Sequence, residues 1–268
     1  MFITDRFVML NYPKTGSTFA RRVLGELHGS GRVRAQLVRL GLVAPPMEDM
    51  FGPRYRMHSA DPEKTTQHLV FAQIPEKHRH KPVLSIVRDP LSSILSAYEY
   101  RDWERYPPGS LNDLRADHPS FPDLGLPEFV RMSQKFMPRE LLGDIPMQVD
   151  IGPGTIQFIR FYARSPRAYL EALRPGMDLA TDHEKHFAPV RFLHTERLNQ
   201  ELHDALVQLG YDREKVAFIL QRAPMNTTRK SAKDPWTPEL IAHVVEKERL
   251  LFRYFPEYMP AGMSIPPA

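Results

Sequence analysis

The chain of 268 residues contains no cysteine, and this absence excludes several kinds of site. Without a thiol there is no disulfide framework, no cysteine nucleophile and no zinc site with cysteine ligands. The lack of disulfides fits a reducing compartment, and we expect a cytoplasmic protein. No apolar run reaches the length that spans a bilayer, and Met1–Arg6 lacks the basic and then apolar pattern of a signal peptide. We therefore expect no stable membrane anchor.

Excess charge of one sign is also scarce, because the formal net charge is only +4. This small positive excess suits an anionic small molecule, and it is too weak to indicate a nucleic-acid partner. The chain has no internal repeats, and its length and its hydrophobic content of 42% are typical of one globular domain. We expect residues 1–268 to form a single domain. The least regular stretch, 99–152, is interpreted as an acceptor-binding insertion or lid, or else as a solvated helix end with surface loops.

One stretch near the N-terminus carries the strongest chemical signal. Phe7–Leu10 is typical of a short buried strand, the chain turns at Tyr12-Pro13, and apolar residues then recur at helical spacing from Phe19 onward. A turn between a strand and a helix directs backbone N–H groups and the positive end of the helix dipole at one point. The pattern predicts a cradle for a phosphate-type group, or else a connection in which a Ser or Thr only caps the helix. The residues of this cradle are Lys14, Thr15, Gly16, Ser17 and Thr18.

A second strand–loop–helix unit begins at Val83–Val87, which is typical of a buried strand. It is followed by Arg88 and by a helix that opens near Pro90. Ligands of open parallel sheets bind outside the carboxyl ends of the strands, so we expect Arg88 to lie at the same edge of the sheet as Lys14. A guanidinium together with the hydroxyl of Ser96 suits a phosphate monoester.

These two units resemble the sulfotransferases that use 3′-phosphoadenosine 5′-phosphosulfate (PAPS). The segment Pro13–Phe19, Pro-Lys-Thr-Gly-Ser-Thr-Phe, is similar to the family's 5′-phosphosulfate loop, and it differs from Walker A because the lysine precedes the only glycine. Arg88 and Ser96 look like the family's 3′-phosphate motif. The resemblance implies a three-layer α/β fold of the P-loop-NTPase-like sulfotransferase type, with helices flanking a mostly parallel central sheet. It also implies transfer of a sulfuryl group from PAPS to a hydroxyl, or less favourably an amine, without a metal.

The resemblance also implies roles for individual side chains. Lys14 would stabilise the leaving 5′-phosphate. Phe19 stands where the family often has Trp, and it would pack on the purine or only in the core. Arg229 and Lys230 resemble a basic loop over the 3′-phosphate, although a solvated loop fits the sequence equally well. In the family, an aromatic residue that touches the adenine often follows the third strand, which we expect at 190–196, but Thr195 stands there instead.

The expected catalytic base is His68. The run from His68 to Pro75 looks like the family's catalytic-histidine segment, and we expect a strand around 65–71. The family often has a lysine two positions before this histidine, where this chain has Thr66, so that role passes to Lys64 or is absent. His58 is the alternative base.

Two other functions fit the same residues. One is a non-catalytic nucleotide-binding protein on the same fold. The other is an atypical phosphotransferase that uses ATP, which would need Mg²⁺ and has Asp89 as its only obvious acidic ligand. The acceptor could be a small molecule, a lipid or a glycan, and the oligomeric state stays open.

Overall fold

The computed structural model describes residues 1–29, 32–55, 61–177, 179–223 and 235–265. Contacts between residues divide the chain into two compact units. The first, here called the sheet unit, comprises Met1–Arg54, Pro62–Arg88 and Pro189–Thr227. The second, here called the helical unit, comprises Tyr55–Asp61, Asp89–Ala188 and Thr228–Ala268. The expectation of a single domain over 1–268 stays a prediction.

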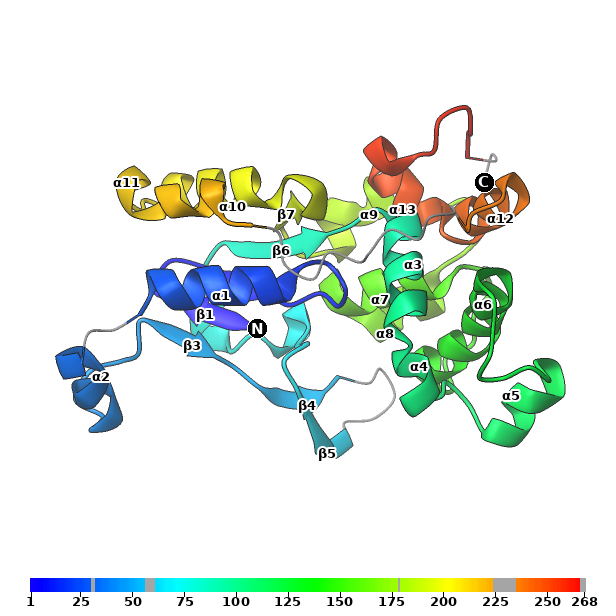
Figure 1. Ribbon diagram of the computed structural model, residues 1–268, viewed down its shortest axis with the longest axis horizontal. Coiled ribbons are helices and arrows are strands. Elements are labelled where there is room, and N and C mark those ends of the chain that lie inside the picture. Colours follow the sequence, from blue (N-terminus) through cyan, green and yellow to red (C-terminus); the bar gives the residue numbers. More distant parts are fainter. Residues whose placement is uncertain (30–31, 56–60, 178, 224–234, 266–268) are drawn as a thin grey trace. The chain divides into compact units, whose positions relative to one another are not determined.

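The sheet unit is built on a sheet of five described strands in the order β3-β1-β2-β6-β7 (Figure 1). Strands β2, β6 and β7 are parallel, with Val83 paired to Val8 on one side and to Val190 on the other. Strand β1 is antiparallel to both β2 and β3, so β3 points the same way as β2. The predicted α/β class with a mostly parallel sheet is therefore confirmed. The strands are β1 (Phe2–Thr4), β2 (Val8–Leu10), β3 (Met47–Asp49), β6 (Val83–Val87) and β7 (Val190–His194).

Two helices cover one face of this sheet, α1 (Ser17–Leu27) and α10 (Leu198–Gln208). Phe19, Val23 and Leu24 of α1 pack in one buried cluster with side chains from β2, β6, β7 and α10. Every residue of β6 is buried, as expected for a central parallel strand. The helical spacing of the apolar residues from Phe19 onward predicts a helix from about Ser17 to His28, and α1 confirms it. Its buried stripe packs α1 on the sheet.

The other elements of the sheet unit include strands that the sequence pattern did not reveal. The pairs Pro45-Pro46, Gly52-Pro53 and Asp61-Pro62 predict a loop over 44–62, but this stretch contains β3, β4 (Gly52–Arg54) and the start of β5 (Asp61–Thr66). Strand β3 pairs with β1 through its backbone and exposes most of its side-chain surface, so it lacks a strong apolar pattern. The strand expected around 65–71 lies instead at 61–66, where β5 pairs with β4. The remaining elements are α2 (Arg32–Arg39), η1 (Phe71–Gln73), η2 (Glu76–His78), η3 (Thr195–Arg197), α11 (Arg213–Val216) and η4 (Ala217–Gln221).

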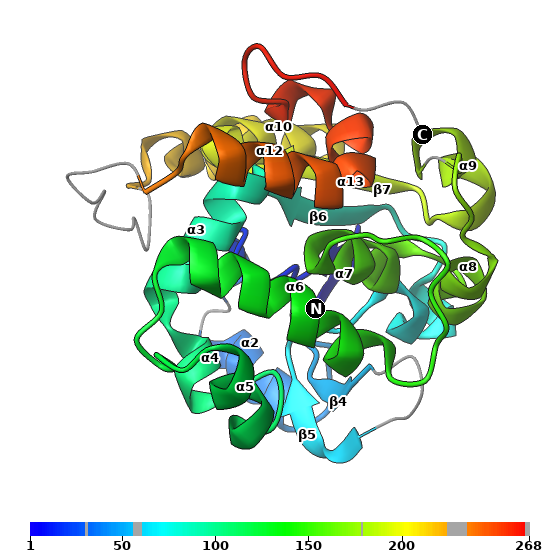
Figure 2. The ribbon, with the colours of Figure 1, turned by 90° about the vertical axis from the view of Figure 1, so that its right-hand side faces the viewer.

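The helical unit contains most of the described helices (Figure 2). Helix α6 (Leu126–Leu142) packs beside α7 (Pro153–Tyr162), and its buried face joins Trp103 and Phe252 in a second apolar cluster. The stretch 99–152 thus contains helices with buried faces, while its role as an acceptor-binding lid stays a prediction. No described helix combines the length and the apolar character needed to cross a membrane. The other helices are α3 (Pro90–Tyr100), α4 (Asp102–Arg105), α5 (Leu111–Asp117), α8 (Pro166–Ala172), α9 (Leu179–His186), α12 (Pro238–Lys247), α13 (Arg249–Tyr254) and η5 (Pro256–Tyr258).

The C-terminal helix differs from its prediction at one point. The side chain of Thr237 caps α12 by accepting a hydrogen bond from Leu240 N, as expected. The sequence predicts one helix over 240–255, with Thr237 as its N-cap and Pro238 at its first position, but the structure has a break at Glu248 between α12 and α13. The side chain of Glu248 bonds to the N-terminus of α7 instead of extending into solvent. The break therefore has a tertiary cause.

Candidate anion-binding site

The turn between β2 and α1 has an unusual backbone. Lys14 has φ 62° and Gly16 has φ 96°, so both lie in the left-handed region. A residue with a side chain is strained there by about 1 kcal/mol or more, and such strain often marks a functional turn. A Cβ atom on Gly16 would lie 3.2 Å from Leu198 Cδ2. Both its φ and its close neighbour therefore favour glycine at position 16.

No side chain caps the start of α1 among the described residues. The N-cap residue is Gly16. The alternative in which Ser17 or Thr18 merely caps α1 is therefore not what the structure contains. The described first turn also holds no acidic side chain. Backbone N–H groups at an uncapped helix start attract an anion, and the positive end of the helix dipole adds to this attraction.

Thr15 stabilises the turn through a hydrogen bond from its hydroxyl to the main chain. Its side chain is buried, and its hydroxyl donates a hydrogen bond to Tyr12 O at 2.9 Å. This hydroxyl is thus engaged with the main chain of the turn, whereas Ser17 is half-buried and Thr18 is exposed.

Arg88 lies against the same turn. It follows β6, the parallel neighbour of β2, and its Nη1 donates a hydrogen bond to Lys14 O at 3.3 Å. The side chain of Arg88 therefore contacts the main chain of Lys14 beyond the carboxyl ends of β2 and β6. This placement follows from strand order, because the carboxyl ends of adjacent parallel strands lie side by side.

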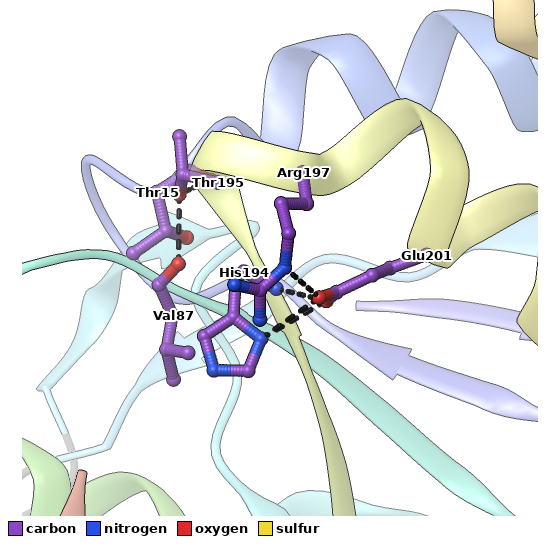
Figure 3. Close-up of polar contacts among 6 residues, drawn as sticks. All are labelled: Thr15, Val87, His194, Thr195, Arg197 and Glu201. Carbon is purple, nitrogen blue, oxygen red and sulfur yellow. Dashed lines mark hydrogen bonds and ion pairs between the residues drawn. The ribbon is translucent and has the colours of Figure 1, made fainter. Parts of the chain in front are cut away.

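The carboxyl end of β7 contributes a third residue, Thr195. Its hydroxyl lies 2.8 Å from Thr15 O and 2.8 Å from Val87 O. Figure 3 draws these contacts as dashed lines. Thr195 thereby ties the cradle turn to the end of β6. In the sequence, Thr195 stands out only because an aromatic ring is missing there. The available signal was a hydroxyl residue directly after a parallel strand.

A polar network holds the same corner of the chain (Figure 3). Glu201 on α10 accepts hydrogen bonds from His194 N at 2.6 Å and from Arg197 Nε at 2.7 Å, and His194 Nδ1 lies 3.0 Å from Glu201 Oε2. Burial acts to raise the pKa of Glu201, but the bonds from His194 and Arg197 outweigh it and hold this pKa below its ordinary value. The ionised carboxylate therefore fixes the junction between β7 and α10, in which Thr195 lies.

His68 lies beside the segment that leads into the cradle. Its Nδ1 is 2.8 Å from the carbonyl oxygen of Asn11, which directly follows β2, and its backbone N–H donates to Thr66 Oγ1 at 3.1 Å. A carbonyl only accepts hydrogen bonds, so we assign the ring proton to Nδ1. In the neutral imidazole this leaves Nε2 as the basic nitrogen. Thr66, which stands in place of the family's lysine, thus supports the histidine backbone.

Several predicted residues lie elsewhere or outside the described structure. The ring of Phe19 is 4% exposed and packs in the buried cluster of the sheet unit, so its described contacts are those of core packing, and its contact with a purine stays a prediction. Ser96 lies in the second turn of α3, in the helical unit, and its contact with a phosphate also stays a prediction. Arg229, Lys230 and the alternative base His58 fall outside the described residues.

The fold and the site define a mixed α/β protein whose parallel strands bring Lys14, Arg88 and Thr195 together at their carboxyl ends. A scan against models of known protein families finds no match, and a search of curated proteins finds none either. The function below rests on the geometry of the site and on the motifs of the sequence.

Proposed function

We propose that this protein is a PAPS-dependent sulfotransferase that transfers a sulfuryl group to a hydroxyl, or less favourably to an amine, of its acceptor. The observation that carries the proposal is the contact between Arg88 and the cradle turn at Lys14 O. It brings the guanidinium of Arg88 to the main chain of Lys14, next to the uncapped start of α1. PAPS carries a 5′-phosphosulfate and a 3′-phosphate. The start of α1 with Lys14 would be the donor group for the first, and the guanidinium of Arg88 would be the donor group for the second.

The residues of the site fit such a donor. The left-handed Gly16 lets the backbone of the turn approach an anion closely, and its lack of a Cβ atom leaves Leu198 undisturbed. The N–H groups at the start of α1 and the ammonium of Lys14 would hold the 5′-phosphosulfate. The guanidinium of Arg88 would bind the 3′-phosphate as a charge-assisted partner.

The chain would then carry out transfer through positioning and charge. When bound, PAPS supplies an activated sulfuryl group. His68 Nε2 accepts the proton of the acceptor hydroxyl while the acceptor oxygen bonds to sulfur and the bond from sulfur to the bridging oxygen breaks. Lys14 and the cradle N–H groups neutralise the charge that develops on that bridging oxygen. The products are the sulfated acceptor and 3′-phosphoadenosine 5′-phosphate (PAP).

One observation speaks against the atypical phosphotransferase. Its only obvious Mg²⁺ ligand, Asp89, caps α3 instead, and its two carboxylate oxygens accept hydrogen bonds from Leu91 N at 3.3 Å and from Ser92 N at 2.9 Å. A carboxylate engaged at a helix start loses these bonds when it turns toward a metal ion.

The test is transfer of labelled sulfate from PAPS to a panel of glycans, lipids, phenols and small alcohols, using the full chain. We expect one acceptor class to be labelled, with the same rate in the presence of EDTA. Calorimetric titration with PAP accompanies the assay. Absence of PAP binding would refute the proposal, whereas PAP binding without transfer to any acceptor would favour the non-catalytic alternative.

A further inference from the structure

We infer that Thr195 is a positioning residue of the anion cradle, through a hydroxyl that orients the backbone of both anchors, the turn and Arg88. The inference rests on the proposed function, since it concerns how this chain binds the nucleotide. It assigns a role to a position at which the sequence offered only the absence of an aromatic ring.

Thr195 orients the peptide unit between Thr15 and Gly16. A trans peptide is planar, and its C=O and N–H groups point in opposite directions. Thr195 Oγ1 holds the carbonyl of Thr15 at 2.8 Å. The N–H of Gly16 therefore points away from Thr195. The same bond turns the partial negative charge of the Thr15 carbonyl away from that N–H, where an anion would be bound.

Thr195 also orients the peptide unit between Val87 and Arg88, at the end of β6. The same hydroxyl lies 2.8 Å from the carbonyl of Val87, so it also fixes the peptide unit from which Arg88 departs. A hydroxyl has a single proton to share between these two carbonyls. Thr195 thus links the position of the turn to the position of Arg88 through one atom. This link sets the spacing between the two groups that would bind the two phosphates of PAP.

The junction between β7 and α10, which contains Thr195, is held firmly in place by packing and by a hydrogen bond. Thr195 Cγ2 lies 4.0 Å, and Leu198 Cδ2 3.2 Å, from the point where a Cβ atom of Gly16 would be. The corner is therefore packed directly behind the cradle turn. Glu201 holds the preceding residue through His194 N, so the β7 end cannot move away without breaking a bond to a carboxylate.

The experiment measures PAP binding by calorimetry for the full-length wild type and the variants Thr195→Val, Thr195→Ala and Thr195→Ser. Valine keeps the shape of the side chain and removes the hydroxyl, and alanine is the second variant in case valine does not fold. We expect the valine and alanine variants to bind PAP roughly tenfold more weakly, which corresponds to the loss of about one hydrogen bond. We expect serine to restore affinity to within about threefold of wild type, because it keeps the hydroxyl.

The matched control is Thr4→Val. Thr4 is a buried threonine at the end of β1, and its hydroxyl donates to Phe7 O at 3.1 Å in the turn that precedes β2, at the opposite end of β2 from the cradle. This variant should lose stability and keep the PAP affinity of wild type. Equal affinity of wild type and Thr195→Val for PAP would overturn the inference and leave the proposed function standing. Absence of PAP binding by the wild type would overturn the proposed function, and the inference with it.

Discussion

Glu248 and Thr155 form a buried pair in the helical unit, joined by hydrogen bonds of 2.7 Å from both the N–H and the hydroxyl of Thr155 to Glu248 Oε2. Gly154 N donates to Oε1 of the same carboxylate at 2.9 Å. The carboxyl group of Glu248 thus occupies the N-terminus of α7, where it accepts hydrogen bonds from backbone N–H groups. This arrangement joins the break between α12 and α13 to the start of a helix about ninety residues earlier.

The pH dependence of stability follows from this pair. Burial raises the pKa of Glu248 above its ordinary value of 4.5, although the bonds from Thr155 and Gly154 oppose this shift. The folded state therefore holds the proton more tightly than the unfolded state. The free energy of unfolding should fall as the pH rises from about 4.5 through the raised value, by at most about 1.4 kcal/mol per pH unit. Glu248→Gln should abolish this contribution.

Urea denaturation across this pH range measures the effect. Glu246→Gln is the control, because Glu246 lies on α12 two residues before Glu248 and is exposed. The control should retain the wild-type dependence on pH. If Glu248→Gln and wild type show the same dependence, Glu248 is not the titrating group.

Gly152 is required by the same carboxylate. Its φ of −75° and ψ of 163° suit any residue, but an added Cβ atom would lie 2.1 Å from Glu248 Oε1. Gly152→Ala should displace the carboxylate from its donors and destabilise the protein by about 2–4 kcal/mol in thermal or chemical unfolding. Gly25→Ala is the control, since an added Cβ at Gly25 in α1 meets no atom within 4 Å. That change should be neutral or stabilising by up to about 1 kcal/mol, because alanine favours a helix. Similar losses for both variants would contradict the role of the carboxylate.

Removing Arg88 should weaken binding of PAP. Arg88→Ala deletes the guanidinium that lies against the cradle turn, and we expect a loss of about 2–3 kcal/mol, because a charge-assisted contact is lost. Calorimetry with PAP measures this change. Arg191→Ala is the control, because Arg191 is an exposed arginine of the same sheet that bonds to Gln208. Undiminished affinity of Arg88→Ala would remove Arg88 from the site.

His68 should affect turnover and leave nucleotide binding intact. Once an acceptor is known, His68→Ala should lower kcat by roughly a hundredfold or more, while the dissociation constant of PAP stays near that of wild type. The exposed His80 provides the control variant, His80→Ala, for which we expect unchanged kinetics. Normal turnover by His68→Ala would exclude it as the base and favour His58.

The parts of the fold that the sequence predicted are those with strong local patterns. The buried strand at β6 and the apolar stripe of α1 are visible in a few consecutive residues, and so is the threonine cap of α12. Strand β3 was missed because backbone pairing with β1 makes it a strand, while its side chains stay largely exposed.

The site was predictable only as two half-motifs. The positions of Lys14 and Arg88 followed from the rule for parallel strands, but their direct contact depends on the order of those strands in the sheet. The role of Thr195 depends on β7 lying beside β6, and no local pattern encodes that neighbour. The break at Glu248 likewise depends on a partner on α7.

The tie at Thr195 spans 180 residues to Thr15 and 108 residues to Val87. During synthesis, both sulfotransferase-like motifs leave the ribosome long before the residue that joins them. A nascent chain that ends before β7 would therefore carry the complete signature without the assembled cradle. Under the proposed function, binding of PAP would therefore require that β7 has already paired beside β6.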